Sequence, residues 1–140
     1  MVYLDTSVAV ALFVPEVKTA SVKEWFISCT EPIVSSDWIV PEFASALSLK
    51  ERRGELATQS ARALWSEFES FRGTGLRLVS VSREAFGVAA RMTRESAGGL
   101  RAGDSLHLAV ALELRASCLA TVDTVLEAIA RRQGLTTIGF

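Results

Sequence analysis

The sequence has few of the residues that build the most familiar metal and redox sites. Its 140 residues include two cysteines, Cys29 and Cys118, and one histidine, His107. Two thiols without a CxxC spacing form neither a zinc site nor a disulfide framework, so we expect reduced packing residues. One histidine is too few for a histidine-based metal site. We interpret His107 as a packed residue and keep general-base catalysis as an alternative.

Several longer patterns are also missing. There is no run of 18 or more apolar residues, so no membrane-spanning helix is expected. The first 15 residues have no basic segment before their apolar stretch, and Asp5 interrupts that stretch, which is not typical of a secretory signal. We therefore expect a cytoplasmic protein. The motifs GxGxxG, GxxxxGK[ST] and GxSxG are absent, which removes the sequence support for nucleotide-binding loops and serine hydrolases.

The charged residues that are present are nearly balanced, with a net charge of −1. The chain as a whole is therefore not strongly attractive to nucleic acid. Twelve of the acids are Glu and only four are Asp. Because Asp is unfavourable inside helices, each isolated Asp calls for a positional reason. The four are Asp5, Asp37, Asp104 and Asp123.

Short apolar segments alternate with amphipathic ones along the whole chain. Strands are expected at residues 2–5, 33–36, 76–81, 118–122 and 136–140. Helices are expected at residues 6–13, 17–29, 39–53, 58–71, 82–95, 104–116 and 124–133. A glycine-punctuated loop is expected at 97–103. Strands that alternate with helices predict one α/β domain over residues 1–140, a three-layer α/β/α sandwich around a short, mainly parallel sheet.

Polar and glycine residues mark the expected helix ends. The expected caps at helix starts are Thr6 or Ser7, Ser36 or Asp37, and Ser82. Gly73 and Gly75 are expected to stop the helix at 58–71. The helix at 17–29 is expected to bury one apolar face, formed by Val17, Ala20, Val22, Trp25 and Phe26.

Three of the four Asp residues fall where an α/β protein places its active site. Asp5 and Asp123 each follow an apolar strand, and sites in open parallel sheets form beyond the carboxyl ends of the strands. Asp104 opens a helix, and Glu42 lies in the first turns of another. These four acids are expected to converge on one edge of the sheet. The alternatives are helix capping for each Asp and a solvated position for Glu42; Asp37 is interpreted as a cap.

Convergent carboxylates repel one another, so at least one would become protonated without a counter-charge. A divalent cation removes this repulsion. Mg²⁺ and Mn²⁺ prefer oxygen ligands and use few protein carboxylates. Such an ion can activate a water and stabilise the leaving oxygen of a phosphodiester.

Four segments resemble the PIN-domain nucleases, specifically the VapC-like toxins of bacterial and archaeal toxin–antitoxin pairs. The segments are YLDTS at Tyr3–Ser7, PE at Pro41–Glu42, AGDSLHLA at Ala102–Ala109 and ATVD at Ala120–Asp123. LDTS and GDSLHLA are the most specific of these. The four occur in the family's order and span the whole chain.

The resemblance implies roles for individual residues. Asp5 and Asp104 resemble the family's main direct Mg²⁺ ligands. Glu42 and Asp123 resemble its other acids, which act through water or on a second ion. Asp123 is also predicted to be a metal ligand. Thr6 or Ser7 is implied to orient Asp5, and Thr121 to hold the site together. The family cleaves single-stranded or looped RNA, binds a small antitoxin that blocks the site, and commonly forms homodimers.

The sequence thus predicts an Mg²⁺-dependent endoribonuclease in which a metal-activated water hydrolyses RNA. Candidate phosphate contacts are Lys50, Arg52, Arg53 and Arg101, with ordinary solvated charges as the alternative. Trp25, Trp38 and Trp65 either line a groove for the antitoxin or belong to the core. Two other functions stay open: a non-catalytic binding module with the same fold, and a DNA-directed nuclease.

Overall fold

The computed structural model describes residues 1–96 and 98–140, in which strands and helices follow the expected order. The strands are β1 (Val2–Leu4), β2 (Ile33–Ser36), β3 (Arg77–Val79), β4 (Cys118–Thr121) and β5 (Thr137–Gly139). The helices are α1 (Thr6–Phe13), α2 (Thr19–Ser28), α3 (Ile39–Arg52), α4 (Thr58–Thr74), α5 (Arg83–Glu95), α6 (Ala102–Glu113) and α7 (Thr124–Arg132). Ala97, the first residue of the expected glycine-rich loop, lies outside the described residues.

All strand pairs in the sheet are parallel, in the order β3-β2-β1-β4-β5. The first strand of the chain is therefore the central one: Val2 pairs with Ile33 on one side and with Cys118 on the other. This topology confirms the parallel α/β class. Because β1 and β4 are neighbours, the residues that follow them, Asp5 and Asp123, lie at the same edge of the sheet.

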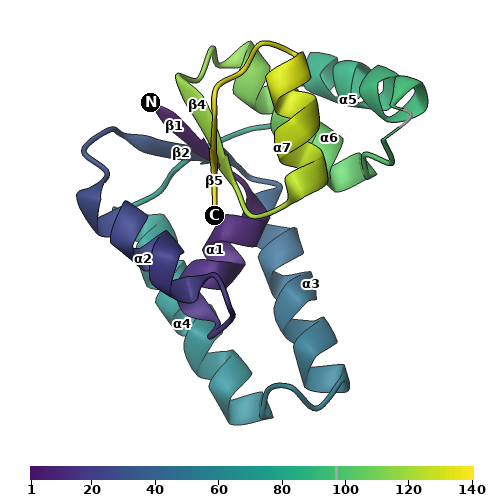
Figure 1. Ribbon diagram of the computed structural model, residues 1–140. Coiled ribbons are helices and arrows are strands. Elements are labelled where there is room, and N and C mark those ends of the chain that lie inside the picture. The colour runs from purple at the N-terminus through teal and green to yellow at the C-terminus, as the bar shows by residue number, and fades with distance from the viewer. Residues whose placement is uncertain (97) are drawn as a thin grey trace.

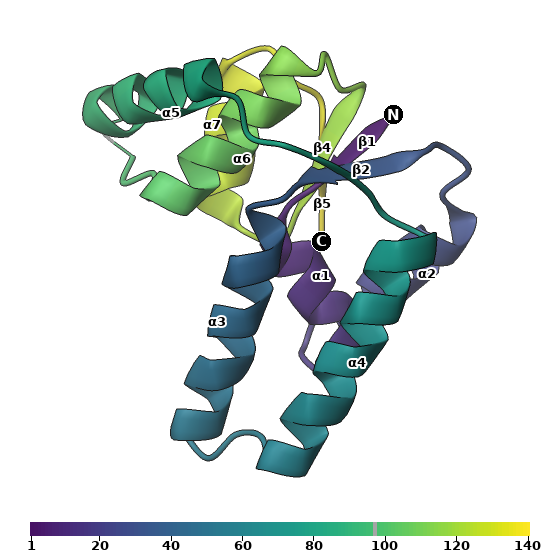
Figure 2. The ribbon, with the colours of Figure 1, turned by 180° about the vertical axis from the view of Figure 1, so that it is seen from behind.

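Helices cover both faces of the sheet, which confirms the three-layer sandwich (Figures 1 and 2). On one face, Tyr3 and Leu119 pack with α5, α6 and α7. On the other face, Val2, Leu4 and Ala120 pack with α1, α3 and α4. The side chains of successive strand residues point to opposite faces, so each short strand contributes to both cores.

The α6 helix is the most deeply buried helix segment near the site. Seven consecutive residues, Ser105 to Ala111, are buried, because α6 packs between the sheet and α5. Its amino end points to the edge where β1 and β4 end, and this brings Asp104 there. On the opposite face, α3 and α4 run side by side away from the sheet (Figure 2), and the first turns of α3 carry Glu42.

Several of the expected helix starts are wrong in detail. The cap of α1 is Asp5, whose side chain accepts from the Ser7 amide, and not Thr6 or Ser7. No side chain caps α3. The Val40 amide in its first turn donates instead to the backbone oxygen of Asp37. Ser82 caps α5 as expected. A residue at the end of a buried strand has the extended backbone that a capping residue needs, which favours Asp5.

The helix boundaries also differ by two or more residues at four places. The α2 helix begins at Thr19, and Val17 lies before it, 96% exposed. Ala20 is exposed too, so the buried face of α2 is smaller than expected. The α4 helix continues through Gly73 and ends at Thr74, with Gly75 as its C-cap. The α6 helix starts at Ala102, two residues early, and ends at Glu113. Within residues 1–96 and 98–140, no helix combines the length and apolarity needed to cross a membrane.

Candidate active site

Asp5 is a buried carboxylate at the carboxyl end of β1. It is only 3% exposed, and its Oδ1 accepts a hydrogen bond from the Ser7 amide at 3.0 Å. Its Oδ2 accepts from the Ser7 hydroxyl at 2.7 Å and from the Thr121 hydroxyl at 2.5 Å. Three hydrogen bonds to one carboxylate fix its orientation. Asp5 is therefore both a helix cap and a firmly held group at the site.

Thr121 and Ser7 join the end of β1 to the end of β4. The Thr121 hydroxyl also accepts from the Asp123 amide at 3.0 Å, and the Ser7 hydroxyl accepts from the Val122 amide at 2.9 Å. Of the two residues expected to orient Asp5, the contact is made by Ser7, whereas Thr6 hydrogen-bonds Glu42. These bonds hold Asp5 and Asp123 in a fixed relation.

Asp123 and Asp104 meet at the guanidinium of Arg101. Nη2 of Arg101 lies 2.8 Å from Asp123 Oδ2 and 3.3 Å from Asp104 Oδ1. Because both oxygens contact the same nitrogen atom, they are at most ~6 Å apart. Nε of Arg101 donates to Asp104 Oδ2 at 2.8 Å. Asp123 Oδ1 caps α7 by accepting from the Val125 and Leu126 amides. The predicted capping role of Asp123 and its place at the site therefore coexist.

The surroundings of Asp104 shift the pKa of its carboxyl in opposite directions. Burial raises the pKa of the Asp104 carboxyl, and the negative charges of Asp123 and Asp5 raise it further. The Arg101 ion pair lowers the pKa but does not fully offset these effects. In turn, the hydrogen bond with Asp104 raises the pKa of Arg101. The three Asp side chains thus form a site with excess negative charge, which favours a cation.

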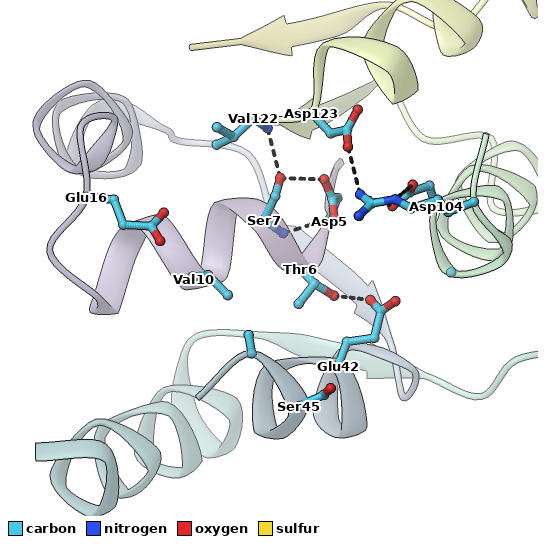
Figure 3. Close-up of a pocket in the computed structure, with 13 residues that line it drawn as sticks. Asp5, Thr6, Ser7, Val10, Glu16, Glu42, Ser45, Asp104, Val122 and Asp123 are labelled. Atoms are coloured by element: carbon cyan, nitrogen blue, oxygen red, sulfur yellow. Dashed lines mark hydrogen bonds and ion pairs between the residues drawn. The ribbon is translucent and has the colours of Figure 1, made fainter. Parts of the chain in front are cut away.

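Glu42 lies across the cavity from these acids, on α3 (Figure 3). Its Oε2 accepts from the Thr6 hydroxyl at 2.5 Å and lies 2.7 Å from Nε2 of His107. Burial alone would raise the pKa of Glu42, but the hydrogen bonds from His107 and Thr6 hold it below its usual value. A Cβ at Gly103 would overlap Oε1 of Glu42, so any larger residue there would push this carboxylate aside. Glu42 is therefore held as an ionised acid.

The cavity between these groups has a volume of about 480 Å³. Asp5, Glu42, Asp104 and Asp123 all line it, together with Arg101. Their oxygens are the hard donors that Mg²⁺ and Mn²⁺ prefer. Within residues 1–96 and 98–140, no three potential ligands already form a metal-binding cluster, and Arg101 bonds Asp104 and Asp123 instead. The donor chemistry fits a divalent cation once the guanidinium moves aside, and its side chain is 72% exposed.

The other expected phosphate contacts lie outside this cavity. Lys50, Arg52 and Arg53 follow Glu42 by 8–11 positions, which places them ~12–16 Å along the helix axis. Lys50 pairs with Glu16 at 2.6 Å, and Arg52 donates to Ser48. Of the four basic candidates, only Arg101 is brought to the acids.

Sequence reasoning missed two contributors to the site. Glu16 lines the cavity, although it lies in the irregular segment after α1, where no pattern singles it out. His107 binds Glu42, although its apolar neighbours favoured a packing role. The sequence did contain a signal for this role of His107: it follows Asp104 by three positions, so both residues lie on the same face of a helix.

Comparison with known proteins identifies the same fold. The family model of the PIN domain matches residues 2–132. VapC20 of Mycobacterium tuberculosis, described as a sarcin-ricin loop cleaving toxin, is 17% identical over 92% of this chain and 95% of its own, with a TM-score of 0.74. FitAcB from Neisseria gonorrhoeae is 19% identical over 99% of this chain and 96% of its own, with a TM-score of 0.75.

A third structure is VapBC2 from Rickettsia felis bound to a DNA fragment of its promoter. It is 15% identical over 100% of this chain and 99% of its own, with a TM-score of 0.70. No curated protein sequence matches the chain significantly. At these identities the structures show the shared fold, and the family model covers nearly the whole chain. The chain with its acidic cavity at the end of β1 and β4 belongs to the PIN domain family.

Proposed function

We propose that this protein is a divalent-metal-dependent endoribonuclease and the toxin of a toxin–antitoxin pair. One observation carries the proposal. Asp5, Asp104 and Asp123, from three distant segments of the chain, line one cavity with Glu42, and the Arg101 guanidinium joins two of them, Asp104 and Asp123. Membership of the PIN domain family supports hydrolysis of nucleic acid.

In this proposal, Asp5, Asp104 and Asp123 hold Mg²⁺, or alternatively Mn²⁺. The cation, when bound, polarises the phosphodiester and lowers the pKa of a water. Ser7 and Thr121 keep Asp5 in place. Glu42 stays ionised and accepts a hydrogen bond from the attacking water. Arg101 leaves the carboxylates and binds a phosphate oxygen, which suits a guanidinium.

RNA is the favoured substrate, and a small antitoxin is the favoured partner. VapC20, which shares the fold, is described as cleaving the sarcin-ricin loop, and VapBC2 was solved on promoter DNA. A DNA-directed nuclease with the same four acids is the second candidate. Recognition of the 2′-hydroxyl separates the two.

A hollow between α3 and α4 supports the antitoxin proposal. It has a volume of about 270 Å³ and an apolar wall that includes Leu47, Ala61 and Trp65. A hollow of this kind accepts an apolar side chain from an amphipathic segment. Glu51 and Arg62 at the same hollow provide charges for the polar residues of that segment.

We also propose a single domain over residues 1–140, a homodimer and a cytoplasmic location.

The decisive experiment compares cleavage of RNA and DNA of one sequence by the purified protein in Mg²⁺. We expect cleavage of the RNA, loss of cleavage in EDTA, and loss with either Asp5→Asn or Asp104→Asn. Asp37→Asn is the matched control, because Asp37 is exposed and does not line the cavity. Activity that survives EDTA or both site variants contradicts the mechanism. Preferential cleavage of the DNA supports the second candidate, and binding without cleavage supports a non-catalytic module.

A further inference from the structure

His107 is a fully buried histidine with a partner at each ring nitrogen. It lies in α6, three residues after Asp104, and is 0% exposed. Its Nδ1 lies 2.9 Å from the Tyr3 hydroxyl, which comes from the central strand. Its Nε2 lies 2.7 Å from Glu42 Oε2 and 2.9 Å from the Thr6 hydroxyl. The ring thus connects the centre of the sheet to Glu42.

The hydrogen-bond partners of the ring indicate which nitrogen carries the proton. The Ser36 amide donates to the Tyr3 hydroxyl at 3.2 Å, so the hydroxyl acts as an acceptor there. The Tyr3 phenol is fully buried and keeps its proton at neutral pH. Donation of that proton to Nδ1 of His107 fits the 2.9 Å contact between the two groups. A neutral imidazole that accepts at Nδ1 carries its own proton on Nε2, which donates to Glu42.

We propose that Tyr3 and His107 form a relay that positions Glu42 for catalysis. Both donors, Nε2 of His107 and the Thr6 hydroxyl, bind the same oxygen, Oε2. The other oxygen, Oε1, lies against Gly103 at the cavity wall. The relay therefore fixes the rotation of the carboxylate and leaves one oxygen for the reaction. This inference rests on the proposed nuclease function and adds a residue to it.

His107 acts through Glu42 and not on the substrate. Its ring is sealed from the cavity by Glu42 and Thr6, so a substrate or an attacking water cannot reach Nε2. This excludes the general-base role considered for His107. It also goes beyond simple packing, because an apolar residue of the same size would remove one buried hydrogen-bond partner from the Tyr3 hydroxyl and one from Glu42.

The test uses three substitutions of His107 in the full chain. His107→Gln keeps a donor near the position of Nε2, His107→Asn keeps only the contact near Nδ1, and His107→Leu removes both. In steady-state RNA cleavage we expect kcat to fall by about 10- to 100-fold for His107→Asn and His107→Leu, as for other groups that orient site ligands. We expect KM to stay nearly constant and His107→Gln to recover most of kcat.

Glu42→Gln then separates positioning from folding. If His107 acts through Glu42, adding His107→Asn to Glu42→Gln lowers kcat little further, because both changes remove one interaction. The proposal is overturned if His107→Asn lowers kcat by the same factor in both backgrounds. It is also overturned if His107→Gln is no better than His107→Asn. Circular dichroism on each variant shows that the comparison is made between folded proteins.

A second measurement does not depend on activity. His107 is the only histidine in the chain, so its ring nitrogens give one unambiguous set of long-range ¹H–¹⁵N NMR signals. We expect the Nε2-protonated tautomer with a slowly exchanging proton, and a mixture of tautomers in Tyr3→Phe. A ring protonated at Nδ1 overturns the relay. If the wild type folds but cleaves no RNA, the proposed function fails, whereas the NMR result still decides the relay.

Discussion

Nη2 of Arg101 donates to Oδ2 of Asp123 at 2.8 Å, across 22 positions of sequence. The same guanidinium binds Asp104, so one exposed cation joins the acid of α6 to the acid that caps α7. Without a metal ion, this side chain balances part of the charge at the site. A divalent cation bound as proposed would use the same carboxylate oxygens, so the two cations would compete.

Replacing Arg101 by alanine is therefore expected to tighten metal binding. Exposed ion pairs contribute about 0.2–1 kcal/mol each, so two of them predict a ~2–30-fold lower Kd for Mn²⁺. The metal-free protein should unfold at a lower temperature because the carboxylates then repel one another. Calorimetric titration with Mn²⁺ and thermal unfolding in EDTA measure the two effects. Arg91→Ala, an exposed residue of α5, is the control. Weaker Mn²⁺ binding in Arg101→Ala would contradict competition.

Asp104→Asn is expected to stabilise the metal-free protein while it removes activity. The pKa of Asp104 is raised in the folded state, mainly by burial, so the ionised form costs stability. Asp104 contributes favourably to the free energy of unfolding below the pKa that it has in the unfolded chain. This contribution is lost as the pH rises through the higher pKa that it has in the folded protein. The stability of the variant relative to the wild type should therefore increase between pH 3 and pH 7 in EDTA. A gain of ~1 kcal/mol corresponds to ~2–4 °C in Tm. An unchanged or lower Tm at pH 7 would show that Arg101 outweighs burial.

Glu42 should show the opposite pH dependence. Its folded pKa is lowered because the hydrogen bonds from His107 and Thr6 outweigh burial. It therefore contributes stability above its ordinary pKa of 4.5, and this contribution is lost as the pH falls through the lower folded pKa. Urea unfolding in EDTA should show the wild type more stable than Glu42→Gln at pH 7, with the difference shrinking by pH 3. A difference that does not depend on pH would refute the assignment.

Two glycine substitutions form a matched pair. A Cβ at Gly103 overlaps Glu42, so Gly103→Ala should displace that carboxylate, at a cost of about 1–3 kcal/mol for overpacking, and reduce kcat. Gly73 lies inside α4 with open space around it, so Gly73→Ala should stabilise the helix by roughly 0.5–1 kcal/mol and leave kcat unchanged. Denaturant unfolding and cleavage assays test both. Equal effects of the two substitutions would exclude a special role for Gly103.

The sequence was sufficient to predict which acids lie at one edge of the sheet. Asp5 and Asp123 follow apolar strands, and parallel strands end at one edge whatever the details of packing. Asp104 needed only a helix that begins near it, and α6 begins two residues earlier, at Ala102. The meeting of Asp5 and Asp123 also needs β1 and β4 to be neighbours, which the strand order shows and the alternation of strands and helices does not predict.

The contacts between side chains could not be predicted. Whether Thr6 or Ser7 reaches Asp5 depends on how the first turn of α1 faces β4, and Ser7 is the one that also meets Val122. His107 reaches Glu42 because α6 has one particular rotation against β1 and α3. Asp37 failed as a side-chain cap although its residue type is typical of caps, since the preference for a residue type does not fix the rotamer.

The central position of β1 affects how the protein is made. Asp5 is synthesised 116 positions before its partner Thr121. At about 5–20 residues per second, the chain waits ~6–23 s before that partner is synthesised. During this time the β4 side of β1 is an unpaired edge, open to association with other strands. A nascent chain therefore has no assembled acidic site, and any cleavage activity begins only after β4 and Asp123 have been added.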